Sequence, residues 1–177
     1  VILEQVSLTG EDTREATTDP EGRFRFDAVT LDPDALYGVV VDYQGALYAT
    51  GLDLSAGPPP SVLLEVYDAS DDESSVSVSN TSVWYSQVDE PSRSLMALEI
   101  VDLRNSTDRT YMPGPDPMKV LRFGLPAGAL ELSVDTDLIE TDVIQVARGF
   151  ALTSPLPPGE HQVAFSYVFP YSGNAAE

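Results

Sequence analysis

The segment that decides the fold is Thr17–Val29, TTDPEGRFRFDAV. Within it, the Asp-Pro-Glu-Gly sequence of Asp19–Gly22 predicts a tight turn. Proline presets φ at the second turn position, and glycine tolerates φ values that other residues avoid. After the turn, Phe24 and Phe26 alternate with charged residues. A period of two predicts a strand with one buried face and one solvated face.

Short alternating runs separated by Pro, Gly, Asp and Ser recur along the whole chain. No window has the apolar spacing of i, i+3, i+4 and i+7 that an amphipathic helix requires. We therefore predict an all-β protein, and the 14 prolines favour two tandem antiparallel β-sandwich domains over a closed barrel. Besides the run that holds Phe24 and Phe26, the expected strands are Val1–Leu8, Tyr37–Tyr43, Ala46–Thr50, Ser61–Tyr67, Val76–Tyr85, Leu95–Leu103, Val120–Leu125, Leu130–Val134, Val143–Val146, Phe150–Thr153 and Gln162–Phe169.

Two segments are expected to connect strands. Thr9–Glu15 is polar and is predicted to form a loop or the end of a hairpin, and Gln44-Gly45 is predicted to form a hairpin turn. The best candidate for a domain boundary is Asp68–Ser75, DASDDESS, because it is acidic and poor in apolar residues. We expect a first domain over 1–69, a linker over 70–75 and a second domain over 76–177.

The charge balance excludes several functions. With 9 Lys and Arg against 29 Asp and Glu, the net charge is -20, so nucleic acid and anionic membranes would be repelled. The absence of cysteine rules out disulfides, thiolate metal sites and cysteine nucleophiles. No apolar run is long enough to span a membrane. Because the sequence begins with Val1, we interpret the chain as a fragment or processed form whose export signal or anchor lies outside it.

The first domain, over residues 1–69, resembles the carboxypeptidase regulatory-like family, a relative of Cna B-type and transthyretin-like modules. The resemblance rests on Thr17–Phe26, Tyr37–Val41 and Tyr43–Gly45. It implies a β-sandwich that serves as a non-catalytic spacer or binding unit of an exported protein. Members usually open with a G-x-V strand that is not clear here, so either the first strand is missing or an outside strand completes the sheet. The isopeptide chemistry of some members is not carried over, because the only lysine is Lys119 in the second domain.

The second domain resembles the immunoglobulin-like domains of bacterial and archaeal envelope proteins. The residues that carry this resemblance are Leu121–Ala129 and Pro155–Glu160, with a Pro-Gly turn leading into the alternating run Val163–Phe169. The resemblance implies an immunoglobulin-like sandwich. It is too generic to transfer any functional residue.

The densest acidic cluster is a candidate metal site. Asp68, Asp71, Asp72 and Glu73 gather carboxylates, and Ca²⁺ takes six to eight oxygen ligands of this kind. The spacing is not that of an EF-hand, and a solvated linker is the alternative. Calcium is the one ion that the sequence suggests, and no other cofactor is expected. The single histidine, His161, has no sequence context of a catalytic triad or a zinc site.

Two asparagines fit the N-x-S/T acceptor pattern for glycosylation, Asn80 and Asn105. Asn105 follows a predicted strand in a polar loop and is expected to be the more accessible of the two. Trp84 and Tyr85 are adjacent on one predicted strand, so we expect one ring to be buried and the other exposed.

These features predict a non-catalytic structural or adhesive segment of an exported cell-envelope or extracellular protein. Its expected partners are other proteins or copies of itself, joined through sheet edges, and self-assembly would need an exposed apolar edge strand near Val1–Leu8. One alternative is an extracytoplasmic accessory subunit of a membrane complex, which would have an exposed hydrophobic patch. Another is a carbohydrate- or calcium-binding module appended to an enzyme. Membrane attachment is expected only through an anchor outside this chain.

Overall fold

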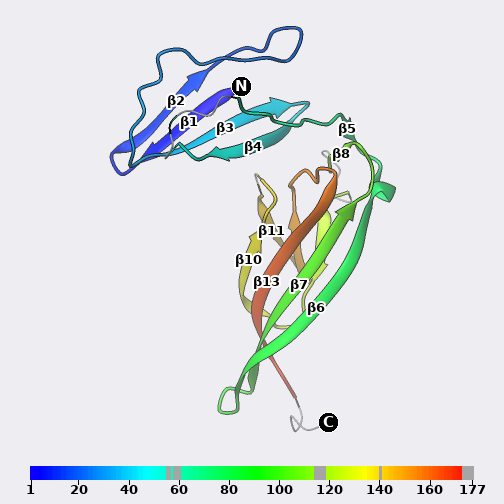
Figure 1. Ribbon diagram of the computed structural model, residues 1–177. Helices are drawn as coiled ribbons and strands as arrows, with labels where there is room; N and C mark the ends of the chain where they lie inside the picture. Colours follow the sequence, from blue (N-terminus) through cyan, green and yellow to red (C-terminus); the bar gives the residue numbers. More distant parts are fainter. Residues whose placement is uncertain (55–56, 58–60, 114–118, 140, 173–177) are drawn as a thin grey trace. The chain divides into compact units, whose positions relative to one another are not determined.

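The computed structural model describes residues 1–54, 57, 61–113, 119–139 and 141–172 (Figure 1). In this part of the chain the ordered elements are β-strands and one short 3₁₀ turn, η1 (Glu73–Ser75), which confirms the all-β prediction. No helix among these residues has the length and apolar composition needed to cross a bilayer. The chain divides into two compact units, Val1–Asp68 and Ala69–Glu177, and each is described by itself.

The first unit has one four-stranded antiparallel sheet in the order β2-β1-β3-β4. Its strands are β1 (Ile2–Ser7), β2 (Gly10–Glu15), β3 (Leu36–Tyr43) and β4 (Ala46–Leu52). The predicted hairpin turn at Gln44-Gly45 is confirmed. Both residues have positive φ, 54° and 85°, as the two central positions of a type I′ turn require.

Two predictions about this sheet are wrong. The exposed apolar edge strand near Val1–Leu8 that self-assembly was expected to use is not found, because β1 pairs with β2 on one side and β3 on the other. The segment Thr9–Glu15 was expected as a loop or hairpin end, and most of it forms edge strand β2. Every residue of β2 except Arg14 is exposed, so its sequence has no apolar alternation to reveal a strand.

The expected strands at Phe24 and Phe26 and at Ser61–Tyr67 are also corrected, because these segments lie outside the strands. The alternation of apolar and polar residues in these segments still indicates which side chains pack on the core. Phe24, Phe26 and Leu64 pack on the buried cluster of Leu3, Tyr37 and Val39. An apolar side chain can cover a sheet without its backbone joining a ladder, and a period of two does not distinguish the two cases.

The turn at Asp19–Gly22 is confirmed. The Gly22 amide donates to the Asp19 carbonyl at 2.9 Å, and Gly22 has φ +80°. The Asp19 carboxylate accepts from the amides of Glu21 at 3.0 Å and Arg23 at 2.8 Å. This turn therefore holds the two phenylalanines against the sheet.

The second unit contains a four-stranded sheet in the order β10-β13-β7-β6, a three-stranded sheet β11-β12-β9 and a short parallel pair β5-β8. The strands predicted between Val76 and Phe169 are confirmed, with ends shifted by a few residues. Their bounds are β5 (Ala69–Ser70), β6 (Val76–Asp89), β7 (Ser94–Asn105), β8 (Thr110–Tyr111), β9 (Leu121–Gly124), β10 (Leu130–Thr136), β11 (Val143–Val146), β12 (Gly149–Leu152) and β13 (Gly159–Pro170).

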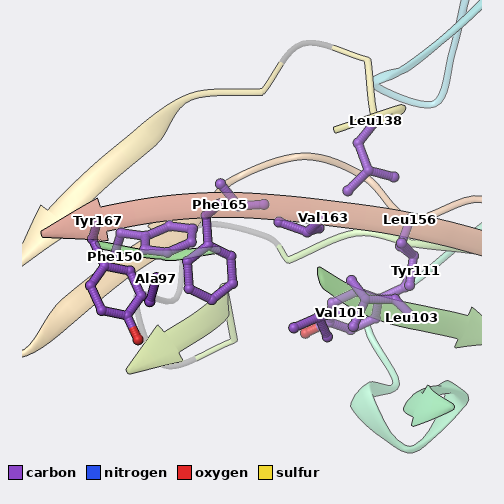
Figure 2. Close-up of a cluster of buried hydrophobic side chains, with 11 residues drawn as sticks. Ala97, Val101, Leu103, Tyr111, Leu138, Phe150, Leu156, Val163, Phe165 and Tyr167 are labelled. Carbon is purple, nitrogen blue, oxygen red and sulfur yellow. The ribbon is translucent and has the colours of Figure 1, made fainter. Parts of the chain in front are cut away.

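The core of the second unit receives side chains from both larger sheets (Figure 2). Ala97 and Val101 of β7 and Phe165 of β13 come from one sheet, and Phe150 of β12 comes from the other. The Phe150 ring stacks on Phe123 at 4.9 Å and meets Phe165 edge-on at 5.0 Å. Aromatic pairs in this distance range add to the stability from area burial. Ala97, Glu99 and Val101 therefore share the inner face of β7, and Leu98 and Ile100 lie on its outer face.

Candidate functional site

The predicted acidic cluster is divided among separate contacts. Asp68 belongs to the first unit, where its carboxylate accepts from the Tyr43 hydroxyl at 3.0 Å and the Gln44 amide at 2.9 Å. Asp71 belongs to the second unit and forms an ion pair with Lys119 at 2.7 Å. These two carboxylates therefore already have partners of their own.

The remaining acids of the cluster stand at the 3₁₀ turn. Asp72 is its N-cap, and its carboxylate accepts from the Ser74 amide at 3.0 Å. Hydrogen bonding from the Ser74 hydroxyl, and then from the Ser74 amide, lowers the pKa of Asp72 below its ordinary value. Glu73 lies in the first turn. Among the described residues no three His, Cys, Asp or Glu side chains are arranged to hold a metal ion. The calcium site stays a prediction, and this geometry does not favour it.

The expectation that Asn105 is the more accessible glycosylation acceptor is wrong. Asn105 ends β7 with 2% of its surface exposed. Its Nδ2 donates to the carbonyls of Arg109 at 2.7 Å and Leu156 at 2.9 Å, and its Oδ1 accepts from the Thr107 amide at 3.1 Å. A glycan on Nδ2 would displace these bonds, so in the folded chain Asn105 is a structural residue.

Asn80 is the exposed member of the pair. It lies on β6, and its Nδ2 donates to the carboxylate of Asp102 on the neighbouring strand at 3.1 Å. Nothing in the structure shows a modification there, and glycosylation of Asn80 stays a prediction. Asn80 is thus more accessible than Asn105, the reverse of the expectation, which had placed Asn105 in a loop.

The only histidine of the chain, His161, contacts one carboxylate and one backbone carbonyl. The His161 ring contacts the Asp137 carboxylate at 3.3 Å and the Pro157 carbonyl at 3.1 Å. Both contacts hold the start of β13 in place. The partners of His161 are thus structural, and no nucleophile is among them.

An apolar groove of about 700 Å³ lies on the sheet of the first unit. Leu3, Tyr37 and Val39 line it from the strands, and Phe24 and Phe26 from the covering segment. This volume falls in the range of small-molecule sites. The charged residues at the groove are exposed, so few buried polar groups would orient a ligand, and we assign none.

The strongest candidate for a contact surface is the edge strand β6. It spans 14 residues and pairs only with β7 in the described part of the chain. The residues from Val76 to Val88 include no charged side chain, although the whole chain carries a net charge of -20. A long uncharged edge strand presents free backbone groups that can pair with another strand.

The other edge strands differ from β6. In the first unit, β2 carries four charged residues among six, and β4 is half as long as β6. In the second unit, β10 includes Glu131 and Asp135, β9 includes Arg122, and β11 has only four residues. Charge and shortness are common ways to protect a sheet edge. Among the edge strands that the structure describes, only β6 is both long and free of charged residues up to its last position, Asp89.

Several large apolar side chains of β6 are exposed. Trp84 has 56% of its surface exposed and Tyr85 has 65%. The expectation that one of these two rings is buried is therefore wrong. They do lie on opposite faces, because Trp84 pairs with Leu98 and Tyr85 pairs with Ala97 of the core. Tyr85 remains exposed because its neighbours give it one ring contact, with Phe169 at 6.3 Å.

One part of the outer face of the four-stranded sheet, along β7, is also apolar, and its side chains there are half-buried. Paired residues share a face, so Trp84 lies beside Leu98, and Met96 beside Val168. The next row places Ile100 beside Ala164. The strand β7 is thus apolar on both faces, as in strands that are covered on both sides. We define the β6 contact surface as the β6 edge together with the side chains of Trp84, Met96, Leu98, Ile100 and Val168.

A polar cluster borders this surface. The carboxylate of Asp102 accepts from Gln162 Nε2 at 3.0 Å and Asn80 Nδ2 at 3.1 Å. These bonds, with Gln162 contributing most, lower the pKa of Asp102 below its ordinary value. An apolar centre with a polar rim is the usual anatomy of a protein interface.

We predict that Gln162→Ala raises the pKa of Asp102 toward its ordinary value. Because the folded-state pKa is lowered, this carboxylate stabilises the fold above the unfolded-state pKa of about 3.9, and the contribution is lost as the pH falls through the folded-state value. NMR titration of the Asp102 carboxyl carbon measures this pKa in the wild type and in the variant. An identical titration midpoint in the variant would contradict the assignment.

Comparison with known proteins adds no identity. No family model, curated protein or solved structure matches this chain. The β6 contact surface was also missed in the sequence, although two signals for it are present there. One is the uncharged run Val76–Val88, and the other is the nearly unbroken apolar run Leu95–Val101.

Proposed function

We propose that this chain is a non-catalytic structural or adhesive segment of an exported cell-envelope or extracellular protein. In this proposal its two units are tandem antiparallel β-sandwich modules, the first like carboxypeptidase regulatory-like modules and the second immunoglobulin-like. The chain acts by binding other protein chains, copies of itself included, through a sheet edge. The observation that carries the proposal is the long, uncharged edge of β6, which no strand among the described residues pairs with.

The chemistry of the surface supports this role. An edge strand offers main-chain hydrogen bonds to an added strand, and the alternate side chains supply specificity. Trp84 is the only tryptophan in the chain, and aromatic residues in the centre of an apolar patch are frequent binding hot spots. The acidity of the rest of the chain keeps other faces apart through like-charge repulsion.

Light scattering tests this function with a matched pair of variants. We expect the wild-type mass to rise above the 19.1 kDa monomer with protein concentration, and Val83→Lys to remain a monomer. Val143→Lys is the control, because Val143 lies on edge strand β11 and is 42% exposed, against 41% for Val83. A lysine on an edge strand blocks strand addition.

The outcomes are distinct. A wild-type chain that stays monomeric at every concentration and salt level would overturn assembly through β6. Equal behaviour of the two lysine variants would overturn the assignment to that edge.

A second candidate function is an accessory extracytoplasmic subunit of a membrane complex. The apolar outer face around Trp84 favours it, because exposed patches of this kind often bind a different protein. The same measurement separates the two functions. An accessory subunit stays monomeric, and its patch still binds a hydrophobic dye.

A further inference from the structure

Two register shifts divide the pairing of β6 with β7 into three regular stretches, of which the middle one is the longest. Register shifts lie between Val78 and Asn80 and between Tyr85 and Gln87. The six residues of Asn80–Tyr85 between them keep an uninterrupted register with β7. A bulge bends the strand and locally disrupts its ladder. The longest part of the free edge that can accept an unbroken ladder is therefore Asn80–Tyr85, which has the length of an average strand.

The charge distribution indicates which strand fits this segment. The chain carries -20 overall, so two copies repel one another across most pairs of faces. Along β6 the first charged residue is Asp89. If two copies of β6 pair antiparallel about the middle of Asn80–Tyr85, each Asp89 lies beyond that segment and faces uncharged residues near the start of β6. This edge is thus a place where two acidic copies can meet without opposing carboxylates.

We propose that Asn80–Tyr85 of β6 pairs antiparallel with the same segment of a second copy, about a two-fold axis at Ser82 or Val83. This inference rests on the proposed function and names its partner. An isologous contact of this kind is self-complementary, because each residue that one copy presents meets its symmetric counterpart. The two four-stranded sheets then form one continuous sheet, and the Trp84 side chains of both copies lie on its outer face.

The symmetry makes a sharp geometrical prediction. A two-fold axis between antiparallel strands stands perpendicular to the sheet, so one residue lies directly opposite its own copy. Their Cα atoms are then about 4.5–5.5 Å apart, which suits a disulfide. A residue two positions from the axis is separated from its copy by four residues along the strand, or about 13 Å. Parallel in-register pairing would instead place every residue of the segment opposite its copy.

A cysteine scan tests the proposal, and the absence of native cysteine makes each variant report on one position. The single variants are Asn80→Cys, Thr81→Cys, Ser82→Cys, Val83→Cys and Trp84→Cys. The control is Ser133→Cys on β10, the other edge of the same sheet, where the residue is exposed. Each protein is oxidised with copper phenanthroline, and covalent dimer is measured on a denaturing gel against an unoxidised sample.

We expect covalent dimer to peak at Ser82→Cys or Val83→Cys and to fall to the control level at Asn80→Cys and Trp84→Cys. Salt should increase the yield at the peak, because it screens the repulsion between the acidic copies. Equal yields at all positions would overturn the antiparallel arrangement, and yields at the control level throughout would overturn pairing through this segment.

The failures of the two proposals are distinguishable. If the light-scattering mass of the wild type rises but no scanned position cross-links, the chain assembles by another route, and only the antiparallel β6 contact is overturned. If the mass stays that of a monomer, both are overturned.

Discussion

Replacement of Gly149 by alanine is expected to destabilise the second unit by at least about 3 kcal/mol, because a buried backbone clash must be relieved. Gly149 begins β12 with φ +153°. A Cβ at this position would lie 1.9 Å from the Phe123 carbonyl oxygen and 3.0 Å from its carbonyl carbon. Both atoms are backbone of the paired strand β9, so no side-chain rotation can make room.

The matched control is Gly124→Ala. Gly124 is paired directly with Gly149 in the same ladder, and a Cβ built there has no atom within 4 Å. We expect its unfolding free energy to change by less than about 1 kcal/mol. Urea unfolding followed by circular dichroism, with amide hydrogen exchange of β12, measures both variants. Equal midpoints for the two alanine variants would show that β9 and β12 do not approach so closely.

The second large effect is expected for Asn105→Asp, with a loss of about 3 kcal/mol or more at neutral pH. The substitution replaces the Nδ2 donor by a carboxylate oxygen beside the carbonyls of Arg109 and Leu156. A buried anion that faces acceptors is desolvated, and each carbonyl loses one of its hydrogen-bond donors. The control is Asn80→Asp on the exposed strand β6, for which we expect a change of less than about 1 kcal/mol.

The pH dependence gives this prediction a sign. Burial beside carbonyls raises the folded-state pKa of the introduced aspartate, so between the unfolded-state and folded-state values the folded chain binds more protons. Stability therefore falls as the pH rises through the folded-state pKa, and lowering the pH should restore part of it. Urea titrations at several pH values measure the unfolding free energy of Asn105→Asp as a function of pH. A variant as stable as Asn80→Asp at neutral pH would contradict the buried role of Asn105.

Burial also raises the pKa of Tyr167 well above its ordinary value, together with its hydrogen bond to Glu99. Glu99 lies on β7 between core residues and is half-buried. The bond satisfies a polar group at the border of the core, where an unpaired one would be costly. Neither residue was singled out in the sequence. There Glu99 is only the one charged residue in the apolar run Leu95–Val101, and nothing links it to Tyr167.

The sequence by itself determined the class of the fold and most of the strands. Period-two alternation around Phe165 and turn residues such as Gln44-Gly45 act over a few residues, and local sterics and burial suffice to specify them. The turn at Asp19–Gly22 is local for the same reason. The same local signals separated buried from exposed positions at Phe24 and Phe26.

The tertiary structure alone decided which strands pair and which polar groups are buried. β1 lies inside its sheet because β3 returns from later in the chain to pair with it. Asn105 is buried because the Leu156 carbonyl arrives from 51 residues away. β6 is an edge because no described strand pairs with its second side. Pairing and burial depend on segments distant in sequence, and local patterns do not record them.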